Sequence, residues 1–409
     1  MFDKSTTFHK WLALISLYMV QGLPHGFFGQ AMPVMLREQG VDLRSIGLMS
    51  LVALPWALKF IWAPVLDRYS LLPSRFAGEY RRSWILAMNH TAVLVLVALS
   101  FLPLPWLIDD GILTIVIVLI LVNLLTATQD IATDAMAVEN LSLKERGLGN
   151  GIQVGGYRIG MVLAGGALLS FYSYIGWQAA LLSVAALMLI GSLPLYFWKP
   201  RKHTAEPSNM WSQWQGFFRL DGALVWLLLI AIYKFGDAFG TQMIRPYLSD
   251  LGLELDQMGT LLGVGGFAAG LFGALLGGFL VGRMSRAYAL FLFLILEGLA
   301  IMAYALVSVE VPLTYWSAVV FEHVAGGMAT AGLFTVMMDR CREHNEGADY
   351  ALQSCLVIVT GMIAGALSGY SASLLGYDSH FVLAGVACFA ALGAVIWASR
   401  RGLFVKLAH

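Results

Sequence analysis

Long apolar runs recur along the whole chain and are separated by short polar breaks. In the first half the runs predict membrane-spanning helices at about 9–34, 45–66, 83–104, 111–138, 147–173 and 177–198. In the second half they predict helices at about 222–248, 258–281, 286–308, 312–338, 348–375 and 380–399. A helix needs about 20 mostly apolar residues to cross a bilayer, and each run meets that length. The pattern predicts an all-α integral membrane protein with twelve transmembrane helices.

The composition supports a membrane protein and excludes several other classes. Hydrophobic residues make up 59% of the chain and charged residues 12%, whereas a soluble domain carries about 25% charged residues. A formal net charge of zero argues against nucleic acid as a partner. The three cysteines show no metal-ligand or disulfide spacing, and no P-loop or nucleophile elbow is present. We therefore expect no enzyme, no metal and no cofactor.

The basic residues orient the predicted helices. If both termini are cytoplasmic, nineteen of the 25 Lys and Arg residues fall in cytoplasmic segments, and only Arg37 and Arg44 fall in the opposite loops. Such an asymmetry is the signature of the positive-inside rule. Both termini are therefore expected on the cytoplasmic side of a bacterial inner membrane.

A longer polar break divides the chain into two halves. It predicts an N-terminal six-helix bundle at 1–198, a cytoplasmic linker at 199–220 and a C-terminal six-helix bundle at 221–409. A shift of 200 residues aligns Gly147 with Gly347 and Gln153 with Gln353. Two related six-helix bundles are typical of transporters that alternate access to a site near the bilayer midplane.

Two loops carry a shared signature at equivalent positions of the halves. The first ends in Asp67 and Arg68, and the second contains Gly278, Gly282 and Arg283. Both resemble the gating-loop motif of the major facilitator superfamily, although the first copy has alanine in place of the usual glycine. The resemblance implies the major facilitator fold, with two pseudo-symmetric six-helix bundles. In that fold, spans one, four, seven and ten line the central cavity.

A narrower resemblance lies between about 20 and 160. The segments 22–24, 40–47, 58–64, 127–135, 145–147 and 156–158 resemble the AmpG-like permeases. This group implies import into the cytoplasm driven by the proton gradient, and it includes muropeptide permeases, acetyl-CoA transporters and siderophore permeases. Segments 30–37 and 54–59 are nearest to the siderophore permeases of the pyochelin and rhizobactin type.

Ionisable residues within the spans form a first set in the N-terminal half. An ionisable side chain at the centre of a span is costly and persists where it is paired or hydrated. Asp130 and Asp134 lie four residues apart and so share a helix face. Lys59 and Arg158 are expected at a similar depth. The four predict an ion-paired network that either clamps three spans together or acts directly in substrate handling and gating.

A second set lies near the midplane of the C-terminal half. Lys234 and Asp237 can pair on span seven, and Glu322 lies beside His323 on span ten. A buried carboxylate or a histidine can carry a proton. We expect Asp237 or Glu322 to be the proton-coupling site, and Glu297 to serve packing. The expected substrate-cavity residues are Gln21, His25, Gln30, Lys59, Asn123, Gln129, Arg158, Tyr233, Lys234 and His323.

These features predict a proton-coupled importer of an organic solute, and a ferric siderophore is the preferred substrate. The alternative is a permease for muropeptides or other anionic conjugates, which the buried cations would attract. A third hypothesis is a membrane sensor with a transporter-like fold and no flux. The expected partners are a small molecule, protons and the lipid bilayer, and the protein is expected to be a monomer.

Overall fold

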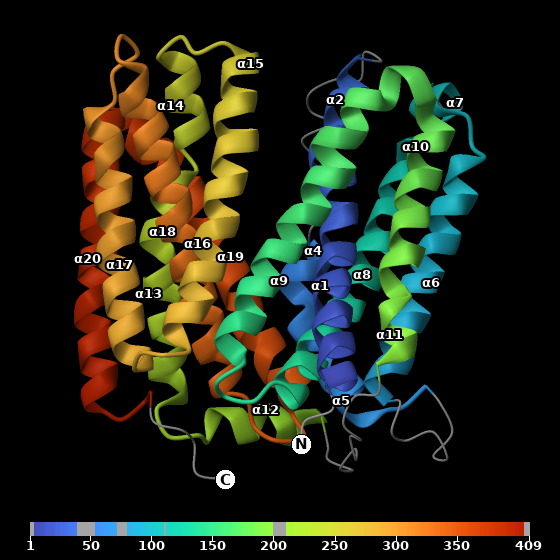
Figure 1. Ribbon diagram of the computed structural model, residues 1–409, viewed down its shortest axis with the longest axis horizontal. Helices are drawn as coiled ribbons and strands as arrows, with labels where there is room; N and C mark the ends of the chain where they lie inside the picture. Colours follow the sequence, from blue (N-terminus) through green and yellow to red (C-terminus); the bar gives the residue numbers. More distant parts are fainter. Residues whose placement is uncertain (1–3, 39–53, 72–79, 110–111, 199–209, 405–409) are drawn as a thin grey trace. The chain divides into compact units, whose positions relative to one another are not determined.

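The computed structural model describes residues 4–38, 54–71, 80–109, 112–198 and 210–404. In this part of the chain the regular secondary structure is helical (Figure 1). Residues 199–209 of the expected linker and residues 45–53 of the expected span 45–66 lie outside the described residues. The described chain divides into two compact units. Unit 1 comprises 1–140, 155–213 and 342–351, and unit 2 comprises 141–154, 214–341 and 352–409.

The helices of the first half of the chain belong mainly to unit 1. They are α1 (Lys4–Gly26), η1 (Phe27–Ala31), α2 (Met32–Glu38), α4 (Leu54–Leu58), η3 (Lys59–Ile61), α5 (Ala63–Arg68), α6 (Tyr80–Ser100), α7 (Leu104–Asp109), α8 (Ile112–Asn140), α9 (Arg146–Val162), η5 (Leu163–Ala167), α10 (Leu168–Ser192) and α11 (Pro194–Phe197). The segments η1 and η5 are π-helical, and each continues directly into the helices beside it.

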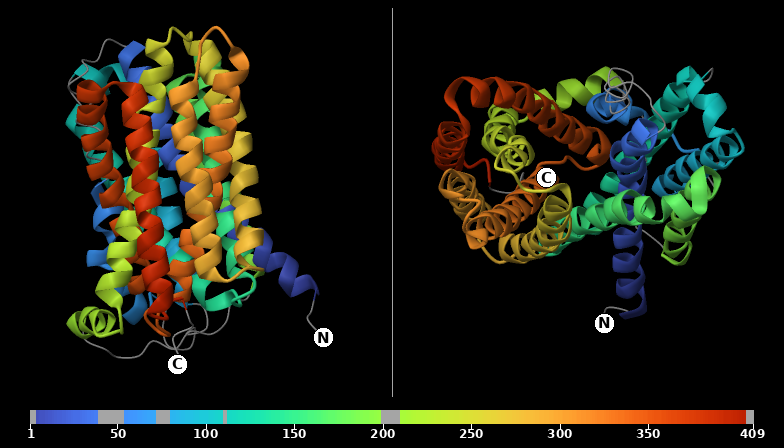
Figure 2. Two further views of the ribbon diagram at one scale, coloured as in Figure 1. Left: turned by 90° about the vertical axis from the view of Figure 1, so that its left-hand side faces the viewer. Right: turned by 90° about the horizontal axis from the view of Figure 1, so that it is seen from above.

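The helices of the second half belong mainly to unit 2. They are α12 (Met210–Phe218), α13 (Ala223–Thr241), α14 (Ile244–Asp250), α15 (Leu255–Met258), η6 (Gly259–Gly266), α16 (Phe267–Val281), α17 (Arg286–Met302), η7 (Ala303–Leu306), α18 (Pro312–Asp339), α19 (Glu346–Leu375) and α20 (Tyr377–Arg400). Here η6 is π-helical. Within unit 2, α17 packs between α18 and α20, and these helices run side by side (Figure 2).

Ten segments of the described chain are long and apolar enough to cross a membrane. One of them, Arg146–Phe197, is 52 residues long and covers two predicted spans. Gly176 separates those spans with a left-handed φ of 70°, which a residue with a Cβ adopts only at a cost. Large apolar side chains such as Leu94, Phe171 and Phe272 are exposed by 59% or more. Lipid is the solvent that accommodates such side chains.

Glycine allows two helices of unit 1 to approach closely. A Cβ at Gly22 on α1 would lie 2.0 Å from the carbonyl oxygen of Tyr157 on α9. A Cβ at Gly160 on α9 would lie 2.0 Å from the carbonyl oxygen of Met19. Apolar helices in lipid associate through such backbone contacts, because no hydrophobic force drives them together. These glycines therefore fix the spacing of α1 and α9, two helices that carry predicted site residues.

Candidate functional site

A buried ion cluster joins three elements of unit 1. Lys59 on η3 forms an ion pair with Asp130 on α8, and its Nζ lies 4.0 Å from Asp134 Oδ2 one turn further along α8. The Tyr18 hydroxyl on α1 donates to Asp134 Oδ1 at 3.2 Å. All three charged side chains are at least 93% buried. Lys59, Asp130 and Asp134 of the expected network thus lie together. Arg158 lies half-buried on α9.

Two tryptophans fix the orientation of α4 and α5 against α8. Trp56 donates to the side-chain oxygen of Asn123 at 2.9 Å, and Trp62 donates to the Thr128 hydroxyl at 3.1 Å. The Lys59 ammonium also lies 5.6 Å from the Trp56 ring centroid, within the range of a cation–π contact. Asn123, which we expected in the cavity, is thereby engaged in holding the helices together.

Two buried glutamines of unit 1 keep hydrogen-bonding capacity. The oxygen and nitrogen of the Gln129 side chain are buried without a partner among the described residues, and so is the Gln21 side-chain nitrogen. Buried amides are normally hydrogen-bonded, and each that is not requires an explanation such as a ligand or water. Gln21 on α1 and Gln129 on α8 are therefore the substrate-binding candidates that the geometry of unit 1 supports best.

The remaining expected cavity residues of unit 1 lie on or beside α1. The His25 ring lies 5.9 Å from the Tyr157 ring, centroid to centroid, and His25 is exposed. Gln30 on η1 is also exposed, and a Cβ at Gly165 on η5 would lie 2.6 Å from its side-chain oxygen. Tyr157 thus connects His25 on α1 with α9.

The first gating-loop residue, Asp67, connects three segments of unit 1. Its carboxylate pairs with Arg81 at 2.6 Å and accepts the backbone N–H groups of Gly347 and Ala348 at 3.1 and 2.7 Å. Arg81 also pairs with Glu139 at 2.9 Å. Asp67 therefore satisfies free N–H groups at the beginning of α19, where a negative charge is stabilised.

The second gating-loop motif lies at the end of α16 in unit 2. A Cβ at Gly278 would lie 2.3 Å from the carbonyl oxygen of Gly147, at the beginning of α9. Gly282 forms the C-cap of α16, and the Arg283 guanidinium lies 3.5 Å from the Phe279 ring centroid. In the first motif, by comparison, the Arg68 guanidinium lies 5.1 Å from the Tyr69 ring centroid. In both copies the arginine contacts an aromatic ring.

Three carboxylates converge in unit 2. Oxygen atoms of Asp237 on α13, Glu297 on α17 and Glu322 on α18 lie within 4.8 Å of one another. Asp237 forms an ion pair with Lys234 one turn earlier on α13. Glu297 is fully buried, and neither of its carboxylate oxygens has a hydrogen-bond partner among the described residues. Glu297, which we expected to serve packing, thus also lies within a cluster of carboxylates.

Two other expected residues adjoin this carboxylate cluster. His323 Nδ1 lies 2.5 Å from Glu322 Oε2, but the ring hydrogen-bonds to the carbonyl oxygen of Val319 at 3.0 Å. The Tyr233 hydroxyl donates to the carbonyl oxygen of Ala329 at 3.5 Å. Glu322 Oε2 has this ion-pair contact with His323 but no hydrogen bond among the described residues. The cluster contains more acceptors than donors.

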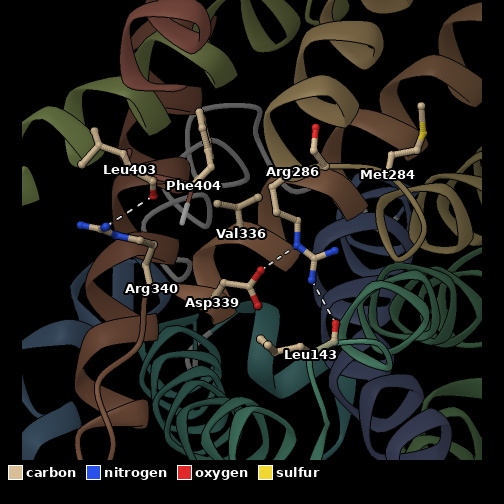
Figure 3. Close-up of a pocket in the computed structure, with 9 residues that line it drawn as sticks. Leu143, Met284, Arg286, Val336, Asp339, Arg340, Leu403 and Phe404 are labelled. Carbon is tan, nitrogen blue, oxygen red and sulfur yellow. Dashed lines mark hydrogen bonds and ion pairs between the residues drawn. The ribbon is translucent and has the colours of Figure 1, made fainter. Parts of the chain in front are cut away.

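A cavity of about 310 Å³ lies between the beginning of α17 and the end of α18 (Figure 3). Arg286 points toward Asp339 and forms an ion pair with it at 2.7 Å, and Arg340 donates to the carbonyl oxygen of Leu403 at 3.4 Å. Burial lowers the pKa of the Arg340 guanidinium, and the charge of Asp221 opposes that shift. The arginines bind helix ends and the segment after α20, which is a stabilising role.

The family model of the Major Facilitator Superfamily matches residues 14–354 and 230–403. The anhydromuropeptide permease of Escherichia coli K12 is 30% identical over 382 residues, which cover 90% of this chain and 75% of that protein. An uncharacterized protein of Haemophilus influenzae is also 30% identical over 380 residues, covering 88% and 87% of the two chains.

Solved structures with the same fold are more distant in sequence. A bacterial homologue of the iron transporter ferroportin, solved in an outward-facing state, has a TM-score of 0.69 at 17% identity and covers 96% of this chain and 99% of its own. The fucose:proton symporter of E. coli has a TM-score of 0.66 at 12% identity, with 97% and 99% coverage. At such identities the likeness establishes the arrangement of helices alone.

Proposed function

We propose, since this chain belongs to the major facilitator superfamily, that it is a permease for a sugar–peptide conjugate of the anhydromuropeptide class. The chain is a multi-pass membrane transporter with the twelve-helix fold of that family. The observation that carries the substrate class is the 30% identity to the E. coli anhydromuropeptide permease along 90% of this chain. Neither relative described above is named as a siderophore permease, so the muropeptide alternative replaces the siderophore as the preferred substrate.

The polar groups of unit 1 support a substrate rich in amides and hydroxyls. An anhydromuropeptide contains sugar hydroxyls, acetamido and peptide amides, and carboxylates. Gln21 and Gln129 supply buried amide groups without partners, and a primary amide both donates and accepts hydrogen bonds.

We further propose a direction for transport and a coupling of transport to protons. We place the protein in the bacterial inner membrane with both termini in the cytoplasm, because the basic residues are concentrated in the segments that this topology makes cytoplasmic. Import driven by protons is the mode that the buried ionisable residues of unit 2 support, since such residues within spans mark ion pathways.

Uptake of labelled anhydromuropeptide by E. coli cells that lack their own permease tests the proposal. Expression of this chain is expected to restore uptake above the level of the empty vector. Gln129→Leu should abolish the restored uptake and Gln129→Asn should retain part of it. Gln178→Leu changes an exposed glutamine on α10 and serves as the matched control, which should transport normally.

Two outcomes would overturn the substrate assignment. The first is uptake of a ferric siderophore, with no uptake of anhydromuropeptide, by cells that express the same amount of protein in the membrane. The second is binding of anhydromuropeptide without accumulation under any ion gradient, which would favour the sensor hypothesis. Membrane levels of each variant are compared by immunoblot, so that a loss of protein is not scored as a loss of transport.

A further inference from the structure

The charges around Glu297 do not balance when all three carboxylates of unit 2 are ionised. Lys234 contributes one positive charge, and it pairs with Asp237. His323 lies beside Glu322 and can compensate that carboxylate when it is protonated. Glu297 has neither a basic partner within salt-bridge distance nor a hydrogen-bond donor among the described residues. A carboxylate in that position is strongly disfavoured in its charged form.

The space around Glu297 limits what can neutralise it. Tyr233, Lys234, Asp237 and Glu297 contribute to the lining of a cavity of about 10 Å³, which corresponds to about one water molecule. On the other side, a Cβ at Gly326 on α18 would lie 3.4 Å from a Glu297 oxygen and 3.5 Å from Glu322 Oε1. A hydrated metal ion does not fit into such a volume, so only a proton or a cation without its water could bind there.

We propose that Asp237, Glu297 and Glu322 form a proton-binding site in which Glu297 is the carboxyl group that gains and loses the proton. Binding converts the Glu297 carboxylate and one proton into a carboxylic acid, and the reverse step returns the proton to water; nothing is oxidised or reduced. The Glu297 O–H then donates to one of the two neighbouring carboxylates, which supplies the donor that the cluster lacks. Lys234 remains the fixed counter-charge of Asp237.

This inference rests on the proposed transport function for its role in coupling, but proton binding itself does not depend on the cargo. Five other titratable or charged groups of the described residues lie near the cluster. They are Tyr233 and Lys234 on α13, Tyr304 on η7, His323 on α18 and Cys388 on α20. Of these, His323 contacts Glu322 directly and can bind a proton, so it is the main competitor for the proton.

Infrared difference spectroscopy of the purified full-length protein distinguishes these groups. A step in pH should change a carboxylic-acid carbonyl band in the wild-type protein, and Glu297→Gln should remove that band. Glu310→Gln alters an exposed glutamate between η7 and α18 and should leave the band unchanged. A band that persists in Glu297→Gln and disappears in Glu322→Gln would overturn the assignment to Glu297.

A second variant keeps the test valid if Glu297→Gln fails to fold. Gly326→Ala adds one methyl group at ordinary contact distance from both glutamates, and it should shift the pH midpoint of the same band by making the site drier. An unchanged midpoint would contradict the geometry. Thermal unfolding in the presence of Na⁺, Mg²⁺, Ca²⁺ or Mn²⁺ tests for a metal site instead. If one of these ions raises the melting temperature of the wild-type protein but not that of Glu297→Gln, the cluster binds a metal ion and the proton-binding proposal is wrong.

Transport assays then separate this inference from the proposed function. In proteoliposomes, Glu297→Gln should exchange anhydromuropeptide across the membrane at a rate near that of the wild type and should fail to accumulate it under a pH gradient. If the wild-type protein moves no anhydromuropeptide, the substrate assignment fails, while the infrared result for Glu297 stands. If Glu297→Gln accumulates substrate normally, the coupling role fails while the substrate assignment stands.

Discussion

Replacement of Lys59 by methionine isolates the energetic role of the ion cluster in unit 1. Methionine retains much of the length of the side chain and removes only the charge. Asp130 and Asp134 would then remain as two buried carboxylates with exposed side-chain fractions of 7% and 3%. Removal of one partner of a buried ion pair costs about 3–5 kcal/mol, because it leaves the other charge buried and uncompensated.

The geometry gives a magnitude of the same order. Two unit charges at about 4 Å interact by about 4 kcal/mol at an effective dielectric constant of about 20. The Lys59–Asp130 ion pair is closer than that, so it contributes at least as much. Lys59→Met should therefore lower the free energy of unfolding by about 3–5 kcal/mol, and the double variant Lys59→Met/Asp130→Asn should recover part of that loss.

Reversible unfolding in mixed detergent micelles, followed by far-ultraviolet circular dichroism, measures these differences. Lys144→Met removes an exposed lysine in the segment before α9 and should change the unfolding free energy by less than about 0.5 kcal/mol. A loss below about 1 kcal/mol for Lys59→Met would refute the argument that these charges depend on one another. Additive losses in the double variant would refute it as well, since residues that interact are not additive.

Further predictions concern packing and the gating loop. Gly22→Ala should sharply reduce the yield of monodisperse protein, because its Cβ would lie 2.0 Å from the Tyr157 carbonyl oxygen. Gly166→Ala, whose Cβ would have no atom within 4 Å, should leave the yield unchanged. Size-exclusion chromatography measures both yields, and equal yields would contradict the prediction. Asp67→Ala removes the acceptor of the first amides of α19, so their hydrogen exchange should become faster. It also removes the partner of Arg81, so the melting temperature should fall. Unchanged exchange of these amides would exclude the proposed capping.

The spans were predictable because the bilayer imposes a simple rule on the chain. A segment within hydrocarbon must be apolar and must satisfy its own backbone, so the hydropathy pattern alone locates the helices. The all-helical fold and the resemblance to the major facilitator superfamily are confirmed by the family match and by the structural neighbours. Lys59 and Asp130 were also predicted together, since the cost of burying one charge requires the other nearby.

The position of Glu297 could not be read from the sequence. Its span is apolar on all sides, so no periodic pattern indicates which face meets α13 and α18. Only the packing of three helices brings Glu297 against Asp237 and Glu322. The one available signal was its location, a single glutamate in an otherwise uncharged stretch of α17. The siderophore branch is not supported by the named relative, and short segments near the N-terminus carry little information about a ligand.

The π-helical segments η1 and η5 have a consequence for comparison with relatives. A π turn contains one residue more than the α-helical turn that it replaces, and such turns are frequent at functional sites. In a relative with a regular helix at Phe27–Ala31 or Leu163–Ala167, the side chains beyond that point would be rotated about the helix axis by about 100° for each omitted residue. An alignment without a gap there would equate side chains on different faces, so the homology of positions such as Gln30 must be established from three-dimensional superposition.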